Sequence, residues 1–436
     1  MKSLCSLTLA FVAIFAGPAD AADSFDWESG VVTMQATSKN FQYLQPWRRQ
    51  SKTVTKTGIV FSKREILTTA EGLQNLTLLR LQRDGRGQWH EGKVVWINYH
   101  ANIAIVSTDQ DSFWTGLKPV ALSDIANGRS DWQIIRWKNG NIERRAAEYN
   151  QFLVQDGRLT FIQHLQLDVS SEIDGVGWGE PLIANGKVIA LATGQIENNC
   201  RFIPVSFFKP LLDARAKGQD RNLGYFPFVW SPVGNPETFD YLNLPGEPRG
   251  ALVISLPSHP KISGDQFKPK DIILEVDGFE IDNEGYYRDP RHGLLIMENL
   301  GTRGHLAGDT IKFKVWREGK EVNLNYKLPP ARFTDKLVPA QTFGEEPGYL
   351  IVGGLVFQPL TQPLLREFGA GWRRSAPFRL SYYADEPPSK DRDGLVLLTM
   401  VLPDPFNMGY QNYRFLVVDS MNGKKVSSLD DIRAAL

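Results

Sequence analysis

The chain has 436 residues, of which 42% are hydrophobic and 22% are charged, the composition of an ordinary soluble globular protein. Its 49 basic and 49 acidic side chains balance, which argues against a generic binder of nucleic acid or anionic membranes, because such a binder needs a basic excess. The length predicts two to four domains.

The first 22 residues have the pattern of a secretory signal peptide. Lys2 supplies a positive start, residues 4–17 form an apolar run too short to span a bilayer, and residues 19–21 (Ala-Asp-Ala) match a cleavage site of small residues. We expect cleavage after Ala21 or Ala22. The sequence therefore predicts a protein that is secreted or periplasmic.

Residues 26–216 contain short runs of alternating apolar residues, separated by Gly, Asn and Asp. A 3.6-residue period first appears at residues 206–216. Regularly spaced short strands predict an all-β barrel or sandwich, closed here by one helix. The expected strands are residues 57–61, 65–69, 76–81, 92–96, 103–108, 159–167 and 187–193.

Two further blocks follow, at residues 222–330 and 345–436. The first holds expected strands at residues 250–254 and within 267–278, and a strand pair at 310–317 and 321–328 joined by a Glu-Gly turn. The second has an expected strand at residues 394–402, an Asn-Gly turn and a helix at 429–436. We find no low-complexity tract and no solenoid period.

Six pieces of sequence, in one order along nearly the whole mature chain, resemble one known family. They are residues 58–70, 99–106, 166–182, 202–205, 267–281 and 352–360, the last with 401–404. The family is that of the HtrA/Deg serine proteases, especially the plant and fungal type with two PDZ-like domains. The resemblance implies a mainly β fold: a trypsin-like double β-barrel at residues 26–216, a PDZ domain at 222–330 and a PDZ-like region at 345–436. The last region lacks the closing strands of the family pattern, and we expect it to be incomplete.

The resemblance places the three triad positions of the family on residues without the required chemistry. Glu71 stands at the histidine position, Asn102 at the aspartate position and Trp178 at the serine position. Acyl transfer needs a hydroxyl nucleophile, an imidazole base and an orienting carboxylate within hydrogen-bond reach. An indole offers only an N–H donor and cannot attack a carbonyl. The sequence therefore predicts that the triad is degenerate and that the chain has no catalytic residues.

The loop that would form the oxyanion hole is also altered. Gly177 and Gly179 flank Trp178, and Glu180 replaces a glycine of the family pattern. We expect its carboxylate to repel the negative charge that the backbone amides of this loop would otherwise bind.

A rearranged active site is the alternative. Ser170 and Ser171 lie seven or eight positions before Trp178, His100 lies close to the aspartate position, and His164 is on an expected strand. These residues are equally explained as polar residues at the surface or at strand ends.

No metal or cofactor signature is found in the sequence. The six histidines lack ligand spacing, and cleavage of the leader leaves Cys200 as the only cysteine, so that no intramolecular disulfide can form. We interpret Cys200 as a small buried apolar residue and expect no cofactor and no metal.

A PDZ domain adds an extended peptide to its sheet and receives the peptide carboxylate on loop amides. The residues at the matching loop are Gly224, Tyr225, Phe226 and Phe228, and we predict that they bind peptide. Pro227 departs from the pattern because it removes one backbone donor. The same aromatic residues would serve equally well as core.

The leading hypothesis is a pseudoprotease that binds polypeptide C-termini or unfolded protein without hydrolysis, as a scaffold, holdase or regulator. The alternatives are an active endopeptidase with an unrecognised nucleophile, and an assembly subunit that associates with an active family member. The resemblance also implies a homotrimer formed through aromatic residues near the mature N-terminus. The candidates for that surface are Phe25, Trp27, Phe41, Tyr43 and Trp47. We expect neither nucleic-acid binding nor a membrane span.

Overall fold

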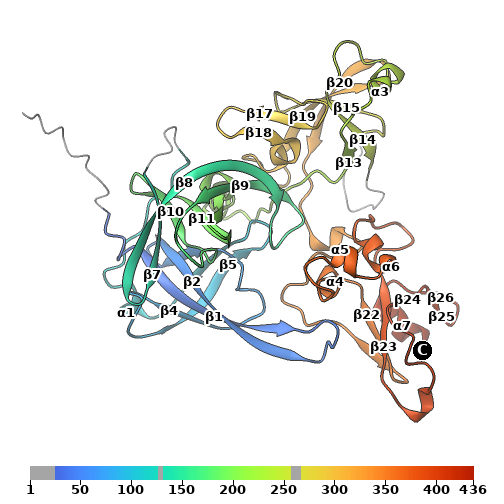
Figure 1. The fold of residues 1–436 in the computed structure, drawn as a ribbon, viewed down its shortest axis with the longest axis horizontal. Coiled ribbons are helices and arrows are strands. Elements are labelled where there is room, and N and C mark those ends of the chain that lie inside the picture. The colour runs from blue at the N-terminus through green and yellow to red at the C-terminus, as the bar shows by residue number, and fades with distance from the viewer. Residues whose placement is uncertain (1–24, 126–130, 257–266) are drawn as a thin grey trace, which may run out of the picture.

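The computed structural model describes residues 25–125, 131–256 and 267–436. The expected signal peptide and its cleavage site lie outside these residues. Two closed β-barrels are followed by a sheet domain and by a smaller C-terminal domain (Figure 1). A trypsin-like double β-barrel followed by PDZ-type domains is thus confirmed as the fold class. None of the described helices is long and apolar enough to cross a membrane.

The first barrel closes in the order β1-β2-β3-β6-β5-β4. Its longest pair is β1 with β2, in register from Val31 opposite Ile59 to Phe41 opposite Arg49. Alternate residues of β1, such as Val32 and Met34, are fully buried in the barrel core. The strands are β1 (Val31–Phe41), β2 (Arg49–Ser62), β3 (Glu65–Thr68), β4 (Leu76–Gln82), β5 (His90–Asn98) and β6 (Ile103–Ser107).

The second barrel closes in the order β10-β11-β12-β9-β8-β7. Helix α1 (Asp111–Trp114) precedes it and helix α2 (Val205–Ala216) follows it, packing on the barrels through Phe207, Phe208 and Leu211. The strands are β7 (Trp132–Lys138), β8 (Asn141–Asp156), β9 (Gln163–Ser170), β10 (Pro181–Ala184), β11 (Lys187–Ile196) and β12 (Asn199–Pro204).

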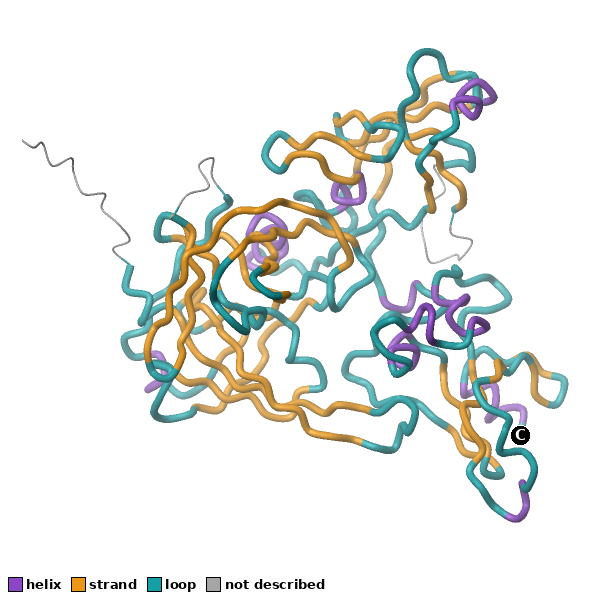
Figure 2. The backbone as a smooth tube through the Cα atoms, in the orientation of Figure 1, coloured by secondary structure: helices purple, strands orange, loops and turns teal. Residues whose placement is uncertain are grey.

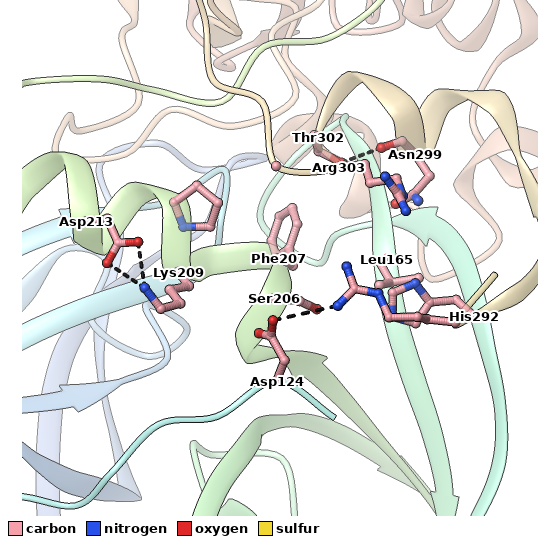
Figure 3. Close-up of a pocket in the computed structure, with 13 residues that line it drawn as sticks. Asp124, Leu165, Ser206, Phe207, Lys209, Asp213, His292, Asn299, Thr302 and Arg303 are labelled. Atoms are coloured by element: carbon pink, nitrogen blue, oxygen red, sulfur yellow. Dashed lines mark hydrogen bonds and ion pairs between the residues drawn. The ribbon is translucent and has the colours of Figure 1, made fainter. Parts of the chain in front are cut away.

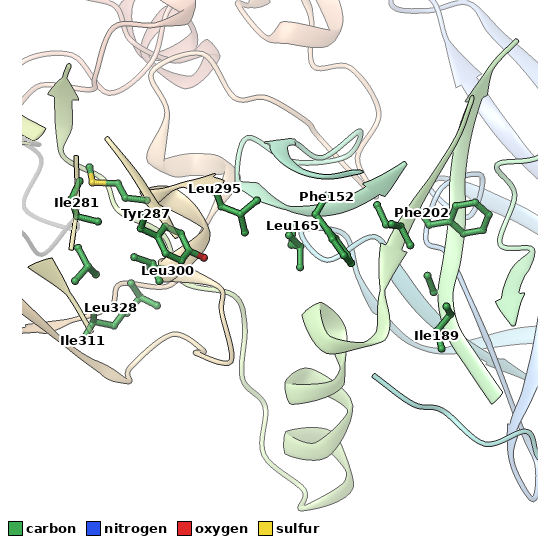
Figure 4. Close-up of a cluster of buried hydrophobic side chains, with 14 of the residues drawn as sticks. Phe152, Leu165, Ile189, Phe202, Ile281, Tyr287, Leu295, Leu300, Ile311 and Leu328 are labelled. Atoms are coloured by element: carbon green, nitrogen blue, oxygen red, sulfur yellow. The ribbon is translucent and has the colours of Figure 1, made fainter. Parts of the chain in front are cut away.

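The next domain is built on a sheet in the order β13-β14-β15-β19-β20, which leaves β13 at one edge. Its elements are β13 (Val229–Ser231), α3 (Pro236–Tyr241), β14 (Ala251–Ser255), β15 (Ile272–Val276), β16 (Phe279–Glu280), β17 (Tyr286–Asp289), β18 (Gly293–Ile296), η1 (Met297–Gly301), β19 (Thr310–Arg317) and β20 (Lys320–Lys327). One apolar cluster runs from this domain into the second barrel, with Leu295 beside Phe152 and Leu165 (Figure 4). The domain is therefore attached to the barrel by shared burial.

The C-terminal domain contains a four-stranded sheet, β21-β22-β23-β24. Most of the helical turns of the chain gather here, beside the sheet (Figure 2). The elements are η2 (Phe333–Asp335) in the linker, then β21 (Leu350–Val352), β22 (Leu355–Pro359), α4 (Gln362–Arg366), α5 (Trp372–Ser375), α6 (Phe378–Ser381), η3 (Tyr382–Ala384), β23 (Val396–Val401), η4 (Pro405–Asn407), β24 (Leu416–Val417), β25 (Ser420–Met421), β26 (Lys424–Lys425) and α7 (Leu429–Ala435).

The tip of the β1–β2 hairpin contacts this C-terminal domain. The Tyr43 amide donates to Glu367 (3.1 Å), and its carbonyl accepts from the Gln358 side chain (2.9 Å). Nearby, the ring of Tyr99 stacks on that of Phe343 at 4.0 Å between centroids. The first barrel therefore holds the C-terminal domain directly, through polar and aromatic contacts.

This arrangement corrects the expectation of an exposed aromatic patch near the mature N-terminus. Trp27 is fully buried and Phe41 is 6% exposed, both in the barrel. The hydroxyl of Tyr43 is hydrogen-bonded to that of Thr342, in the contact between the hairpin and the C-terminal domain. Trp47 packs edge-on against Tyr349. Phe25 packs on Trp27. Trp27 and Phe41 are therefore unavailable for contacts between chains, whereas Trp47 is 37% exposed, and the homotrimer stays a prediction.

Candidate functional site at the boundary of the two barrels

The three residues that the resemblance assigns to the triad positions lie on loops that meet between the barrels. Glu71 follows β3, Asn102 immediately precedes β6, and Trp178 precedes β10. The Glu71 amide donates to Oδ1 of Asn102 (2.9 Å), and the Ala70 amide donates to the Asn102 carbonyl (3.1 Å). Asn102 has a φ of 53°, a left-handed conformation that asparagine tolerates. The structure thus brings Glu71 and Asn102 into contact through the backbone.

A lysine that the sequence analysis missed occupies the centre of this boundary. Lys56, on β2, is 1% exposed, and its Nζ donates to Oγ1 of Thr69 (2.8 Å) and to the carbonyl of Glu71 (2.6 Å). The ammonium also lies 5.5 Å from the ring centroid of Trp178, within cation–π range. Burial lowers the pKa of Lys56 to about 8, while the charges of Glu71 and Glu180 partly oppose that shift.

Glu71 is held against the second barrel by an arginine. Its Oε1 lies 3.1 Å from the Arg158 guanidinium, which also donates to the Thr193 carbonyl (3.3 Å). Oε2 of Glu71 is buried and has no hydrogen-bond partner. Burial raises the pKa of this carboxyl, and the nearby charges of Arg158 and Lys56 oppose the rise. Glu71 is therefore part of a charge network with Arg158 and Lys56.

The contacts of Glu180 correct the expectation that its carboxylate only repels anions at the oxyanion loop. Its Oε2 accepts hydrogen bonds from the backbone amides of Gly177 (2.9 Å) and Trp178 (2.8 Å). The neighbouring amide of Val176 donates to the Gln195 side chain (2.8 Å). These backbone donors are satisfied inside the protein. An incoming oxyanion would have to compete with a buried carboxylate for them.

Gly179 completes the junction between the two barrels. Its φ is 94°, and an added Cβ would lie 2.6 Å from the Thr57 carbonyl, so only glycine fits here without a shift of the backbone. The Thr57 amide donates to the carbonyl of Trp178 at 3.0 Å. The loop therefore rests directly on β2, next to Lys56.

The residues of the rearranged-site alternative have other partners. Oγ of Ser170 bonds to Asn150, and Oγ of Ser171 donates to the Ala146 carbonyl (2.7 Å). His100 is paired with Thr160 (2.8 Å), and His164 stacks on Phe207 at 4.3 Å. Burial lowers the pKa of each of these histidines to about 4, so both are neutral near pH 7.

Cys200 lies in the core of the second barrel, fully buried, and is free. Burial, with the charge of Glu180, raises its pKa to about 11, so the thiol stays protonated and unreactive. In residues 25–125, 131–256 and 267–436, no three His, Cys, Asp or Glu side chains are grouped so that they could hold a metal ion.

A polar cavity of about 720 Å³ opens beside Arg158, against the ends of β8 and β11. Its walls are mostly amide and charged side chains, including Gln155, Gln166 and the Arg201–Asp168 ion pair (2.9 Å). A smaller cavity of about 290 Å³ separates α2 from the PDZ-type domain (Figure 3). Lys209 is paired with Asp213 in it, and Arg291 faces Asp124 at 3.8 Å. Its charges are largely compensated within the protein.

The predicted peptide-binding loop leads into β13. Gly224 bridges to Pro330, and Tyr225 packs edge-on against Phe161 of the second barrel. Phe226 stacks on Phe228 at 5.4 Å, and Phe228 is only 4% exposed. Phe228 therefore fills the core, while Phe226, just before β13 in the chain, remains half-buried and packs against Phe313.

Comparisons with known proteins agree with this architecture. A PDZ domain family model matches residues 338–436. "Putative protease Do-like 3, mitochondrial" of Arabidopsis thaliana is 25% identical over 92% of this chain and 70% of its own length. "Protease Do-like 2, chloroplastic" of the same plant is 23% identical over 92% of this chain and 66% of its own.

Among solved structures, the HtrA-type protease AlgW with a decapeptide has the same fold. It covers 70% of this chain and 96% of its own, with 16% identity and a TM-score of 0.50, and a second AlgW structure with a decapeptide reaches 0.52. The chain is a homologue of the HtrA/Deg proteases. Its double barrel has the fold of the HtrA-type protease structure, and its C-terminal region matches the PDZ domain model.

The buried ammonium of Lys56 predicts a specific pH dependence of stability. Its pKa is about 8 in the folded protein against 10.5 ordinarily, so the unfolded chain binds more protons between these values. The free energy of unfolding of the natural protein minus that of Lys56→Met should therefore rise by roughly 3 kcal/mol from pH 8 to pH 10.5. A difference that does not change over this pH range would contradict the assignment.

Removal of the Glu180 carboxylate should uncover the loop amides. We expect Glu180→Ala to lower hydrogen-exchange protection of the Gly177 and Trp178 amides about 10- to 100-fold, because a buried donor left without its acceptor costs about 1–3 kcal/mol. Glu180→Gln retains an acceptor oxygen and should lose less. Glu172→Ala, at an exposed residue earlier in the same segment, is the control. Unchanged protection in Glu180→Ala would show that the carboxylate does not hold these amides.

Proposed function

We propose that this HtrA/Deg homologue binds polypeptides without hydrolysing them, as a scaffold, holdase or regulator. The observation that carries the proposal is the state of the barrel boundary. The resemblance assigns the nucleophile position to Trp178, whose side chain is an indole. The carboxylate of Glu180 accepts hydrogen bonds from the backbone amides of Gly177 and Trp178. A serine protease needs a hydroxyl there and free amides for the oxyanion.

The position of the base supports the same proposal. Glu71 replaces the histidine, and its carboxylate pairs with Arg158 at 3.1 Å instead of facing a nucleophile. Asn102, at the aspartate position, uses its side-chain oxygen to accept the Glu71 amide. None of the three residues supplies the imidazole base or the hydroxyl nucleophile of a serine-protease triad.

Peptide binding needs none of the catalytic residues. The strand β13 is at the edge of its sheet, and Val229 on it is 54% exposed, so an extended peptide has room to pair there. The AlgW relative was solved with a decapeptide, which supports a peptide ligand for this chain as well. Export after cleavage at Ala21 or Ala22 is part of the same proposal, and an assembly subunit that associates with an active family member is an alternative to it.

The first test of the proposal is peptidase activity. Purified protein should not react with a serine-directed fluorophosphonate, and it should degrade unfolded casein no faster than Trp178→Ala. The triple variant Glu71→His, Asn102→Asp, Trp178→Ser should stay inactive, because Glu180 still holds the loop amides, and a misplacement of about 1 Å costs ~100-fold in rate. A labelled serine would instead support the alternative, an active endopeptidase with an unrecognised nucleophile.

The second test is recognition of peptide C-termini by the whole protein. We expect dissociation constants of about 1–100 μM for peptides with an apolar free C-terminus, toward the weak end because Pro227 supplies no amide. Amidation of the terminus should weaken binding sharply. Phe226→Ala should also weaken it, whereas Tyr241→Ala, 70% exposed on the same domain, should not. Equal binding of free and amidated peptides would mean that the carboxylate is not recognised.

A further inference from the structure

A carboxylate that reaches the edge strand β13 has one oxygen without a hydrogen-bond partner. Oε1 of Glu298, on η1, accepts the indole N–H of Trp230, on β13, at 2.6 Å. Oε2 of the same carboxylate is buried and has no partner among the described residues. A buried carboxylate oxygen without a donor is costly, so a ligand that supplies a donor to this atom gains from the contact.

The charges around Glu298 favour a cation as that donor. Burial raises the pKa of Glu298, and the negative charge of Asp156, at the end of β8, raises it further, while the hydrogen bond from Trp230 opposes the rise. Arg303, in the loop after η1, pairs with Asp289 at 2.6 Å and not with Glu298. The carboxylate of Glu298 therefore lies beside a second negative charge.

Two further cations lie near Asp156, and they leave Glu298 unpaired. Partial burial raises the pKa of Asp156, and the charges of Lys336, in the linker, and Arg373, on α5, oppose the rise. Arg373 is itself paired with Asp385. In the part of the chain that the structure describes, neither cation is within ion-pair distance of Glu298. A cationic ligand group at Oε2 would thus supply a charge that the protein does not.

The alternation of side chains along β13 assigns Glu298 to one position of a bound peptide. Phe226, Phe228 and Trp230 all pack on one apolar cluster, so they point to the same face of the chain. A peptide whose carboxylate is received before β13 runs antiparallel to this strand, with its last side chain near Phe228. Because peptide side chains also alternate, the side chain two residues before the last lies near Trp230 and Glu298.

We propose that Glu298 makes the β13 edge selective for peptides with a lysine or arginine two residues before an apolar, free C-terminus. This selectivity rests on the proposed peptide binding at β13. The terminal torsion of a glutamate is broad, so the carboxylate can turn Oε2 toward the peptide while Trp230 still donates to Oε1. A charge-assisted hydrogen bond is about twice as strong as a neutral one. A glutamate at the same peptide position would instead be repelled by Glu298 and Asp156.

The test is binding of three labelled peptides to the purified full chain, measured by fluorescence anisotropy. The peptides end in X-Ala-Val with a free carboxylate, where X is lysine, norleucine or glutamate. Norleucine has a straight apolar side chain and no charge. We expect the lysine peptide to bind about tenfold more tightly than the norleucine peptide, and the glutamate peptide about threefold more weakly than the norleucine peptide.

Matched variants assign this preference to Glu298. Glu298→Gln keeps an acceptor for Trp230 and removes the charge, so its dissociation constants for the lysine and norleucine peptides should agree within about twofold. Glu321→Gln is the control, because Glu321 is exposed on β20, at the opposite edge of the sheet from β13. It should keep the full preference for lysine. A preference that persists in Glu298→Gln overturns the proposal.

The peptide series separates this proposal from the peptide binding on which it rests. Equal binding of all three peptides to the natural protein overturns the role of Glu298 and leaves peptide binding at β13 intact. If none of the three binds with a dissociation constant below about 1 mM, peptide binding at β13 is overturned and the selectivity with it.

Discussion

The buried ammonium of Lys56 is the constraint around which the barrel boundary is built. A charge taken out of water is tolerated only where hydrogen bonds and opposite charges replace its hydration. The Thr69 hydroxyl and the Glu71 carbonyl supply the hydrogen bonds, and Glu71 and Glu180 supply negative charge from either side. The network spans both barrels, because Lys56 is on β2 and Glu180 leads into β10.

This network occupies the backbone donors that an oxyanion hole at this boundary would need. Catalysis by an oxyanion hole depends on donors that are preorganised and vacant until charge develops. Here the same kind of backbone donors are preorganised around Glu180, a charge that belongs to the protein. These hydrogen bonds stabilise the conformation of the loop that contains Gly177 and Trp178. The ion pair of Arg158 with Glu71 then fastens the loops of the first barrel to the second.

Sequence patterns predicted much of the fold where local rules act. The strand pair at 310–317 and 320–327 follows from alternation and a Glu-Gly turn, in which Glu318 and Gly319 both have positive φ. The long strands β1 and β8 were missed because their polar ends leave the barrel and lack alternation. The strand expected from residue 159 begins only at 163, since residues 157–162 form a turn held by Thr160.

The resemblance predicted individual residues of the candidate site but not the network around them. Glu71, Asn102 and Trp178 were each assigned to one triad position, and these assignments stay predictions. Lys56 lies at no motif position, and its burial results from pairings across two barrels that no local window contains. Charge follows the same logic. A sum over the sequence gives zero, whereas the fold places the ammonium of Lys56 out of water, near the charges of Glu71 and Glu180. The electrostatics of the barrel boundary therefore depend on which charges the tertiary structure brings together, and composition does not contain that property.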